Sequence, residues 1–441
     1  MTNLEIGMAS FPVLLTLIFL RVPIGLSMFL VGAFGLYFVT GSTNMAMSRL
    51  KSETYSTFSS YSLSIIPLFL LMGHFATLGG MSQALFKAAE AFLGHRRGGV
   101  AMSAVGACAG FGAICGSSLA TAATMSQVAL PELRRYGYAG GFSTATLAAG
   151  GTLGILIPPS VVLVIYAILT EQNIAKLFLS AFVPGILAAL GYMLTISIYA
   201  RLYPDRAGTA RAPMPYAERF KALRAVWPVL TVFLVVVGGI YMGIFTPTEG
   251  AAVGALGTGL IALANRGLNR RTLSESFLTT ARSTAMIFFI VLGAAFFNGF
   301  LALTQLPQSL SSYVVELGLS PWMVLTIILL VYLILGAVMD SLSMILLTIP
   351  IFFPIVVNLD FGLTAEETAI WFGIIVLIVV EVGLITPPVG MNLFVINSMD
   401  RLTPMIETYK AVMFFVASDI IRVIILVLFP GITLFALRMM Y

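Results

Sequence analysis

Three acidic residues, Asp340, Glu381 and Asp419, lie inside long apolar stretches of this chain. A carboxylate at membrane depth is energetically expensive, so such residues are candidates for a functional role. Asp340 sits where its apolar stretch is interrupted, which favours an ion-related role over a structural cap. Glu381 precedes Gly383 by two residues, and it is as consistent with partnering a helix break as with direct contact to an ion. Asp419 is followed three residues later by Arg422, which favours an ion pair within one helix.

The motif Gly-x-x-x-Pro-Pro occurs twice, as Gly154 to Pro159 and as Gly383 to Pro388. Proline lacks an N–H and clashes with the carbonyl four residues back, so each helix must break there. The carbonyls of residues 154–155 and 383–384 are therefore expected to lose their partners. At membrane depth such carbonyls persist where they line a cavity or bind something. Corresponding interruptions in two halves of a membrane protein indicate a transporter's binding site.

Composition places these motifs in a membrane protein. The chain has 441 residues, of which 59% are hydrophobic and only 9% charged, against about 25% charged in soluble chains. The net charge of +5 lies in loops, which argues against a nucleic-acid binder. None of the lysines follows a glycine, so a phosphate-binding loop for ATP is absent. Cys108 and Cys115 match no metal or redox spacing and are interpreted as packing residues.

Apolar stretches approach the roughly 20 residues that a spanning helix needs at ten places. The predicted spans are 4–20, 23–40, 62–79, 142–169, 177–200, 226–243, 248–264, 283–303, 369–396 and 411–437. Residues 43–60 are polar and aromatic, which is typical of an interfacial helix. With the N-terminus outside, most of the 23 Lys and Arg residues fall in inside loops, and the outside loops are mostly acidic.

Two apolar stretches fit a re-entrant hairpin better than a span. Residues 99–131 are flanked by arginine pairs on both sides, so a single crossing would leave one pair outside. We expect this hairpin to enter from the cytoplasm with its tip near Cys115–Ser118. Residues 321–355 have acidic flanks and are expected to enter from outside, with a tip near Met339–Ser341. The alternative in each case is one long tilted helix.

The two halves of the chain are predicted to form an inverted-topology repeat. The first half comprises residues 1–203 with a broken helix over 142–169, and the second comprises 225–441 with a broken helix over 369–396. A cytoplasmic connector, 204–224, separates them. The halves also start alike, with Phe11-Pro12 in one and Trp227-Pro228 in the other. The predicted fold class is an all-α polytopic membrane protein with about ten spans and two re-entrant hairpins.

Hairpin tips that meet broken helices would form two clusters of carbonyl and hydroxyl oxygens. Hard oxygen ligands suit hard cations, and the small fixed charge at each cluster favours a monovalent ion such as Na⁺. The half-helices after Pro159 and Pro388 would direct their positive dipole ends inward, which favours an anionic substrate.

These segments resemble the large membrane subunit of tripartite ATP-independent periplasmic (TRAP) transporters over essentially the whole chain. The segments that carry the resemblance are Ser64 to Phe69, Gly112 to Ser118, Gly154 to Ser160, Thr246 to Glu249 and Gly383 to Asn392. The resemblance implies an elevator-type, Na⁺-coupled importer of organic acids such as C4-dicarboxylates or sialic acid in the bacterial inner membrane, and no enzyme activity or cofactor. It also implies two partners besides the lipid bilayer, a small membrane subunit of about four helices and a periplasmic substrate-binding protein. The small subunit is expected to be a separate chain, since little sequence precedes Leu4.

The resemblance also implies site residues. The first Na⁺ site would use Ser117, Ser118, Gly154 and Pro158, and the second would use Asp340, Ser341, Gly383 and Thr386. Substrate would lie between the tips, near Ser118, Thr121 and Asn392. For each serine, small-residue packing between helices is the alternative.

Other functions stay open at this point. A stand-alone sodium/dicarboxylate symporter of a related fold would share the paired hairpins and broken helices, and it would differ by working without a binding protein. A membrane scaffold or an ion channel belongs to another class. Paired helix breaks argue against a scaffold, and flux that requires no substrate would distinguish a channel.

Overall fold

A computed structural model describes residues 2–440, and for residues 311, 314 and 315 it describes the backbone alone. The described chain is helical throughout and forms no strand apart from an isolated bridge between Tyr138 and Ala207. The first half contains α1 (Asn3–Phe19), α2 (Ile24–Thr40), α3 (Thr43–Phe58), α4 (Ile65–Leu78), α5 (Met81–Leu93), α6 (Gly99–Cys115), α7 (Ser118–Arg135), α8 (Gly140–Leu156), α9 (Val161–Thr170) and α10 (Ile174–Leu202). The second half contains α11 (Tyr216–Tyr241), α12 (Pro247–Ala264), α13 (Arg270–Thr304), α14 (Leu306–Glu316), α15 (Pro321–Gly336), α16 (Ser341–Val357), α17 (Ala365–Ile385), α18 (Met391–Met399), α19 (Met405–Leu428) and α20 (Pro430–Met440).

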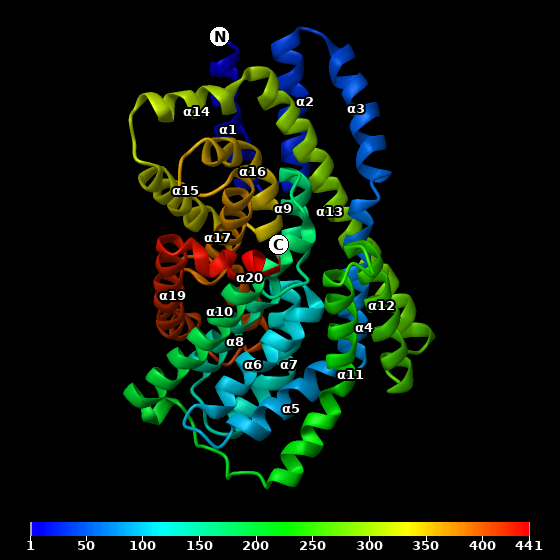
Figure 1. Cartoon of the computed structure of the whole chain (residues 1–441), viewed down its shortest axis with the longest axis vertical. Helices are drawn as coiled ribbons and strands as arrows, with labels where there is room; N and C mark the ends of the chain where they lie inside the picture. Colours follow the sequence, from blue (N-terminus) through cyan, green and yellow to red (C-terminus); the bar gives the residue numbers. More distant parts are fainter. Residues whose placement is uncertain (1, 441) are drawn as a thin grey trace.

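The order of elements in the first half recurs in the second. A helix pair (α1–α2, α11–α12) is followed by a long arm, which is α3 with α4 in one half and α13 in the other. A short helix (α5, α14), a helical hairpin (α6–α7, α15–α16) and an interrupted helix (α8–α9, α17–α18) come next, and then a long helix (α10, α19). Figure 1 shows the first hairpin in the lower half of the molecule and the second in the upper half. How these halves are oriented in a bilayer stays a prediction.

The long arm of each half packs against the helix pair of the other half. α2 packs along α13, where Gly293 lies so close to α2 that an added Cβ atom would be 2.2 Å from the carbonyl oxygen of Gly25. α12 packs along α4 in the same way, and there Gly254 faces Met72. Small residues let the helix backbones approach closely, as is common between helices in membranes. Each arm is therefore held by the helix pair of the other half, and Figure 1 shows α2 beside α13 and α12 beside α4.

The centre of the molecule is formed by α8 and α17, which are apolar on all sides. Every residue of α17 from Thr368 to Ile385 is buried, and so is every residue of α8 from Gly141 to Leu156. A helix that is hydrophobic all round belongs in the interior, because no face of it needs water. Both interrupted helices thus lie in the interior, where a hairpin can pack against each of them.

The all-α, polytopic organisation predicted from the sequence is confirmed. α10, α11, α13, α17 and α19 are long and apolar enough to cross a membrane, and two bent pairs, α3 with α4 and α8 with α9, raise the number from 5 to as many as 7. α1 and α2 coincide with predicted spans but have only 17 residues each. The bent pair α3–α4 joins the predicted interfacial helix 43–60 to the predicted span 62–79 at an angle of 55°.

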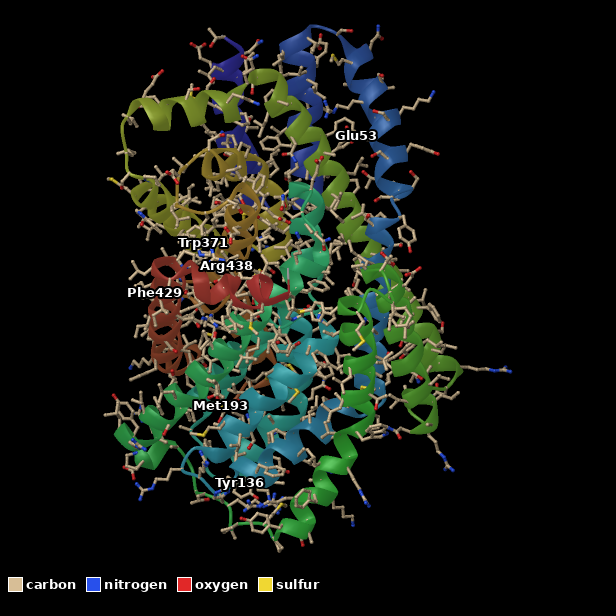
Figure 2. All side chains as sticks on the ribbon, viewed as in Figure 1. Glu53, Tyr136, Met193, Trp371, Phe429 and Arg438 are labelled. Atoms are coloured by element: carbon tan, nitrogen blue, oxygen red, sulfur yellow. The ribbon has the colours of Figure 1, made fainter. Side chains whose placement is uncertain are left out.

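One predicted boundary is wrong. The span 411–437 is two helices, because α19 ends at Leu428 with Phe429 as its C-cap, and Pro430, which has no N–H to donate, begins α20. Figure 2 labels Phe429 at this corner and Trp371 of α17, whose indole N–H donates to the carbonyl of Leu426 at 3.1 Å. α11 begins at Tyr216 after the N-cap Pro215, inside the stretch 204–224, and the assignment of that stretch as a cytoplasmic connector stays a prediction.

Candidate functional site

The tip of the first hairpin is a two-residue turn between α6 and α7. Gly116 has a positive φ of 63°, and a Cβ atom there would lie 3.0 Å from the carbonyl oxygen of Pro159. Ser117 is the N-cap of α7, and its hydroxyl accepts a hydrogen bond from the backbone N–H of Ala120 at 3.4 Å. The tip therefore reaches the break between α8 and α9, as the sequence predicted.

Two glycines let the hairpin approach the interrupted helix. A Cβ atom on Gly112 would lie 2.5 Å from the Cα atom of Gly154, so α6 and α8 are in backbone contact. A Cβ atom on Gly154 would in turn lie 2.4 Å from Thr121 Oγ1 and 2.8 Å from the carbonyl oxygen of Ser117. Thr121 Oγ1 is buried and has no hydrogen-bond partner among the described residues. Oxygen atoms of the tip thus converge on Gly154.

The break in the first interrupted helix is short. α8 ends at Leu156, Ile157 is extended, and Pro158 and Pro159 follow with a cis peptide bond between them. Ser160 then caps α9 by accepting a hydrogen bond from the N–H of Leu163 at 3.3 Å. Pro158 thus ends α8. Because it has no backbone N–H, it cannot donate a hydrogen bond to the nearby oxygens.

The second tip repeats this arrangement. Asp340 is the N-cap of α16, and its Oδ2 atom accepts a hydrogen bond from the N–H of Ser343 at 3.0 Å. A Cβ atom on Gly383 would lie 2.6 Å from the Cα atom of Gly336, which places α15 and α17 in backbone contact. The carbonyl of Ala337 accepts from the N–H of Gly390 at 3.2 Å, so this tip is bonded directly to the break between α17 and α18.

One expectation about the second break is wrong. The carbonyl of Gly383 was expected to lack a partner, but it accepts from the N–H of Thr386 at 3.0 Å because the last turn tightens. The Thr386 hydroxyl donates to the carbonyl of Val382 at 2.6 Å, and Tyr409 of α19 donates to the carbonyl of Pro388 at 2.6 Å. Hydrogen-bond donors of the protein therefore satisfy more of the carbonyl oxygens at this break than the sequence indicated.

Glu381 of α17 lies between the two tips. Its side chain is buried, and its Oε2 atom accepts a hydrogen bond of 2.5 Å from the hydroxyl of Ser118 on the first tip. The second hairpin adjoins the same part of α17, because a Cβ atom on Gly336 would lie 3.2 Å from the carbonyl oxygen of Val380. The Oε1 atom of Glu381 has no hydrogen-bond partner among the described residues. The carboxylate thus lies where hairpins from both halves meet α17.

A buried polar chain leads away from this carboxylate through α8, α10 and α19. Thr152 and Tyr192 share a hydrogen bond of 2.9 Å, and the Tyr192 hydroxyl donates to Asp419 Oδ2 at 2.7 Å. Arg422 pairs with Asp419 at 2.7 Å, which confirms the predicted ion pair within one helix. Both ions of the pair are buried and lie in electrostatic range of Glu381.

The three residues expected near substrate, Ser118, Thr121 and Asn392, come together where α7, α8 and α18 pack. Asn392 donates from Nδ2 to the carbonyl of Ala148 at 3.3 Å, and its Oδ1 atom has no described partner. All three side chains are buried, with exposed fractions of 0–1%. In this conformation they are closed to solvent, and whether they contact substrate stays a prediction.

The sequence left Glu381 open between partnering the helix break and contacting an ion, and it did not indicate the hydrogen bond from Ser118. The position of Glu381 in a fully apolar run was the available signal. Among residues 2–440, no group of three or more His, Cys, Asp or Glu side chains could hold a metal ion. The polar atoms at and between the tips are mainly hydroxyl and carbonyl oxygens with two carboxylates, Asp340 and Glu381, a donor set that suits a hard cation of low charge.

A helical membrane protein in which two hairpin tips meet two interrupted helices has the architecture of a secondary transporter. The sequence matches the family described as "Tripartite ATP-independent periplasmic transporter, DctM component" over residues 11–432. The chain belongs to this family. Its relatives are permeases, so it is a transporter subunit and not an enzyme.

Two relatives and one solved structure illustrate the similarity. The chain is 39% identical to the C4-dicarboxylate TRAP transporter large permease protein DctM of Pseudomonas aeruginosa, over 88% of this chain and 89% of that protein. It is 29% identical to the sialic acid TRAP transporter large permease protein SiaM of Vibrio cholerae, over 95% and 96% of the two chains. The crystal structure of the YdaH transporter of Alcanivorax borkumensis has a TM-score of 0.58 at 15% identity and covers 87% of this chain and 89% of that one, which indicates a shared fold.

Proposed function

We propose that this chain is the large membrane subunit of a Na⁺-coupled, binding-protein-dependent importer of small organic acids. The observation that carries the proposal is the pair of tip-to-break contacts, Gly112 with Gly154 and Gly336 with Gly383, which bring the oxygen-bearing tips of the hairpins against the interrupted helices. Such oxygen clusters suit a monovalent cation. We propose Ser117, Ser118 and the Gly154–Pro158 break for one ion, and Asp340, Ser341 and the Gly383–Thr386 break for the other.

The proposed substrate class is a small organic acid such as a C4-dicarboxylate or a sialic acid. Relatives named for these substrates, and one named for isethionate, support this class. The N-terminus of α9 adjoins the first tip, where a Cβ atom on Gly116 would lie 3.6 Å from the N atom of Val161, and Gly390, the N-cap of α18, donates to Ala337 at the second tip. A helix N-terminus favours negative charge. Asn392, at the start of α18, is our candidate for a substrate contact together with Ser118 and Thr121.

The proposed partners are a small four-helix membrane subunit and a periplasmic binding protein, consistent with the word "tripartite" in the family's description. We place the chain in the bacterial inner membrane with its N-terminus in the periplasm, since basic residues concentrate in alternate loops. Lys176 and Arg438 depart from that charge pattern, but they pair with Glu366 and Glu367 at 2.7 Å and 2.8 Å. In the elevator movement that we propose, the hairpins and interrupted helices would move against α1–α4 and α11–α13.

Transport in reconstituted vesicles tests the proposal. Purified chain, small subunit and binding protein should take up a labelled dicarboxylate or sialic acid with an inward Na⁺ gradient. Replacing Na⁺ by K⁺ should abolish uptake, and omitting the binding protein should do the same. Equal uptake in K⁺ would refute the ion coupling. Uptake without the binding protein would instead favour the stand-alone sodium/dicarboxylate symporter.

A further inference from the structure

Glu381 is a buried carboxyl group whose negative charge, when it is ionised, is not balanced by the side chains around it. Arg422, the basic group in its electrostatic range, is already paired with Asp419 at 2.7 Å. With all three groups ionised, this part of the interior carries one excess negative charge. Burying an unpaired charge is unfavourable, and a bound cation would offset it.

The hydrogen bond from Ser118 to Glu381 leaves the serine oxygen suited to bind that cation. A serine hydroxyl has one donor and two acceptor lone pairs. Its donor is directed to Glu381 Oε2 at 2.5 Å, so both lone pairs stay available on the side of the tip. Nearby, the carbonyl oxygen of Ser117 and Thr121 Oγ1 both converge on Gly154. Partners that orient a ligand in this way are as characteristic of ion sites as the ligands themselves.

The second hairpin packs against α17 on both sides of this carboxylate, since a Cβ atom on Gly336 would lie 3.2 Å from the carbonyl oxygen of Val380, and one on Gly383 would lie 2.6 Å from the Cα atom of Gly336. Asp340, by contrast, uses its Oδ2 atom to cap α16. The group that lies between the halves is therefore Glu381 on the central helix α17, which accepts from Ser118 of the first tip, 263 positions away in the chain, and follows Val380 at the contact with the second hairpin.

We propose that Glu381 is the positioning residue that supplies the negative charge for cation binding at the first tip and couples this tip to the second. This inference rests on the proposed Na⁺-coupled function and extends it to a residue and to cooperativity between the two ion sites. A cation at one tip would fix the carboxylate and thereby order the hydroxyl that faces the other tip.

The variant Glu381→Gln tests the charge with little change of shape, because the amide oxygen can still accept from Ser118. Removing outer partners of metal ligands weakens ion binding by about 10- to 100-fold. We therefore expect Glu381→Gln to raise the Na⁺ concentration that gives half-maximal uptake by about 10- to 100-fold. Glu381→Asp should recover part of it. Glu90→Gln is the matched control, since it neutralises another buried carboxylate that lies on α5 and is paired with Arg211.

The experiment measures two quantities: uptake by the full complex against Na⁺ concentration, and the thermal stabilisation of the purified chain by Na⁺ at constant ionic strength with K⁺. The wild type and Glu90→Gln should show a Hill coefficient above one, and Glu381→Gln should need more Na⁺ and approach a coefficient of one. In Ser118→Ala, adding Glu381→Gln should change the Na⁺ requirement little, since both act through one contact.

The outcomes separate this inference from the proposed function. A wild type that ignores Na⁺ in both measurements would overturn the proposed function itself. A Na⁺-dependent wild type with an unchanged Glu381→Gln variant would overturn only the role of Glu381. If Glu381→Gln does not fold, Glu381→Asp and Ser118→Ala decide the matter, and an unaltered Na⁺ requirement in both contradicts the proposal.

Discussion

Gly112 and Gly154 are in backbone contact, and a Cβ atom added to Gly112 would lie 2.5 Å from the Cα atom of Gly154. Gly336 and Gly383 form the same contact in the second half, with a corresponding distance of 2.6 Å from Gly383. Each pair joins one helix of a hairpin to the interrupted helix beside the tip of that hairpin. The spacing between tip and break is therefore set by residues that have no side chain.

Alanine at these contacts should separate the tips from the breaks. We expect Gly112→Ala and Gly383→Ala to destabilise the fold by about 1–3 kcal/mol, the usual range for overpacking, and to reduce transport strongly. Gly238→Ala on α11 is the control, because nothing lies within 4 Å of the added Cβ atom. Thermal unfolding and uptake at equal expression check this, and a normal Gly112→Ala variant would contradict the close contact.

Asp340 can be tested by separating its cap from its charge. Asparagine is as good an N-cap as aspartate, whereas alanine loses about 1 kcal/mol, so only Asp340→Ala should lower the melting temperature. At about 4 Å and an effective dielectric constant near 20, a charge pair contributes roughly 4 kcal/mol before desolvation. A net loss of about 1–2 kcal/mol in Asp340→Asn would raise the Na⁺ requirement roughly ten- to thirtyfold.

Transport by Asp340→Asn should recover at high Na⁺ concentration while expression stays normal. If the Na⁺ dependence of this variant matches that of the wild type, Asp340 is only a cap of α16 and does not belong to the second ion site.

The ion pair of Asp419 and Arg422 should contribute to folding only as a pair. Arg422→Met leaves a buried carboxylate without its partner, which we expect to destabilise the protein by about 3–5 kcal/mol. Adding Asp419→Asn removes the unpaired charge and keeps an acceptor for the Tyr192 hydroxyl, so the double variant should be more stable than Arg422→Met alone. Equal melting temperatures of the single and double variants would show that the pair is not coupled.

Cysteine labelling tests the predicted hairpins. Arg97 and Arg135 flank the first hairpin and are exposed, and the two native cysteines are buried and free. Single cysteines at both arginines should react with an impermeant reagent from the cytoplasmic side only. A cysteine at the exposed Asp360, after the second hairpin, should react from the periplasmic side. Labelling of positions 97 and 135 from opposite sides would mean that α6 and α7 cross the membrane.

The free energy of unfolding should depend on pH through Glu90 on α5. Burial raises the pKa of Glu90 above its ordinary value, Arg211 and Arg135 act to lower it, and Glu132 acts to raise it. The folded protein then holds this proton more tightly than the unfolded chain, so the contribution of Glu90 to stability is lost as pH rises through the raised pKa. As pH rises above 4.5, the melting temperature of Glu90→Gln should fall less steeply than that of the wild type. Parallel profiles of the two proteins would show that Glu90 does not cause the pH dependence.

The sequence by itself determined where the chain breaks. The Pro-Pro pairs that begin at Pro158 and Pro387 remove two successive N–H donors, and α8 and α17 end just before them, whereas single prolines such as Pro184 lie inside continuous helices. The turns at Gly116 and before Asp340 were likewise visible as interruptions in apolar stretches. These are local effects of backbone chemistry, and hydropathy then indicated a helical membrane protein.

Tertiary structure decided which oxygens lack partners and which residues meet across the halves. The carbonyl of Gly383 was expected to be free, but the final turn of α17 tightens and Thr386 bonds to it. No local pattern indicates that Ser118 meets Glu381, because that contact depends on how α7 packs near α17 rather than on sequence spacing. A buried polar group is defined by its neighbours, and those neighbours come from elements that are far apart in the chain.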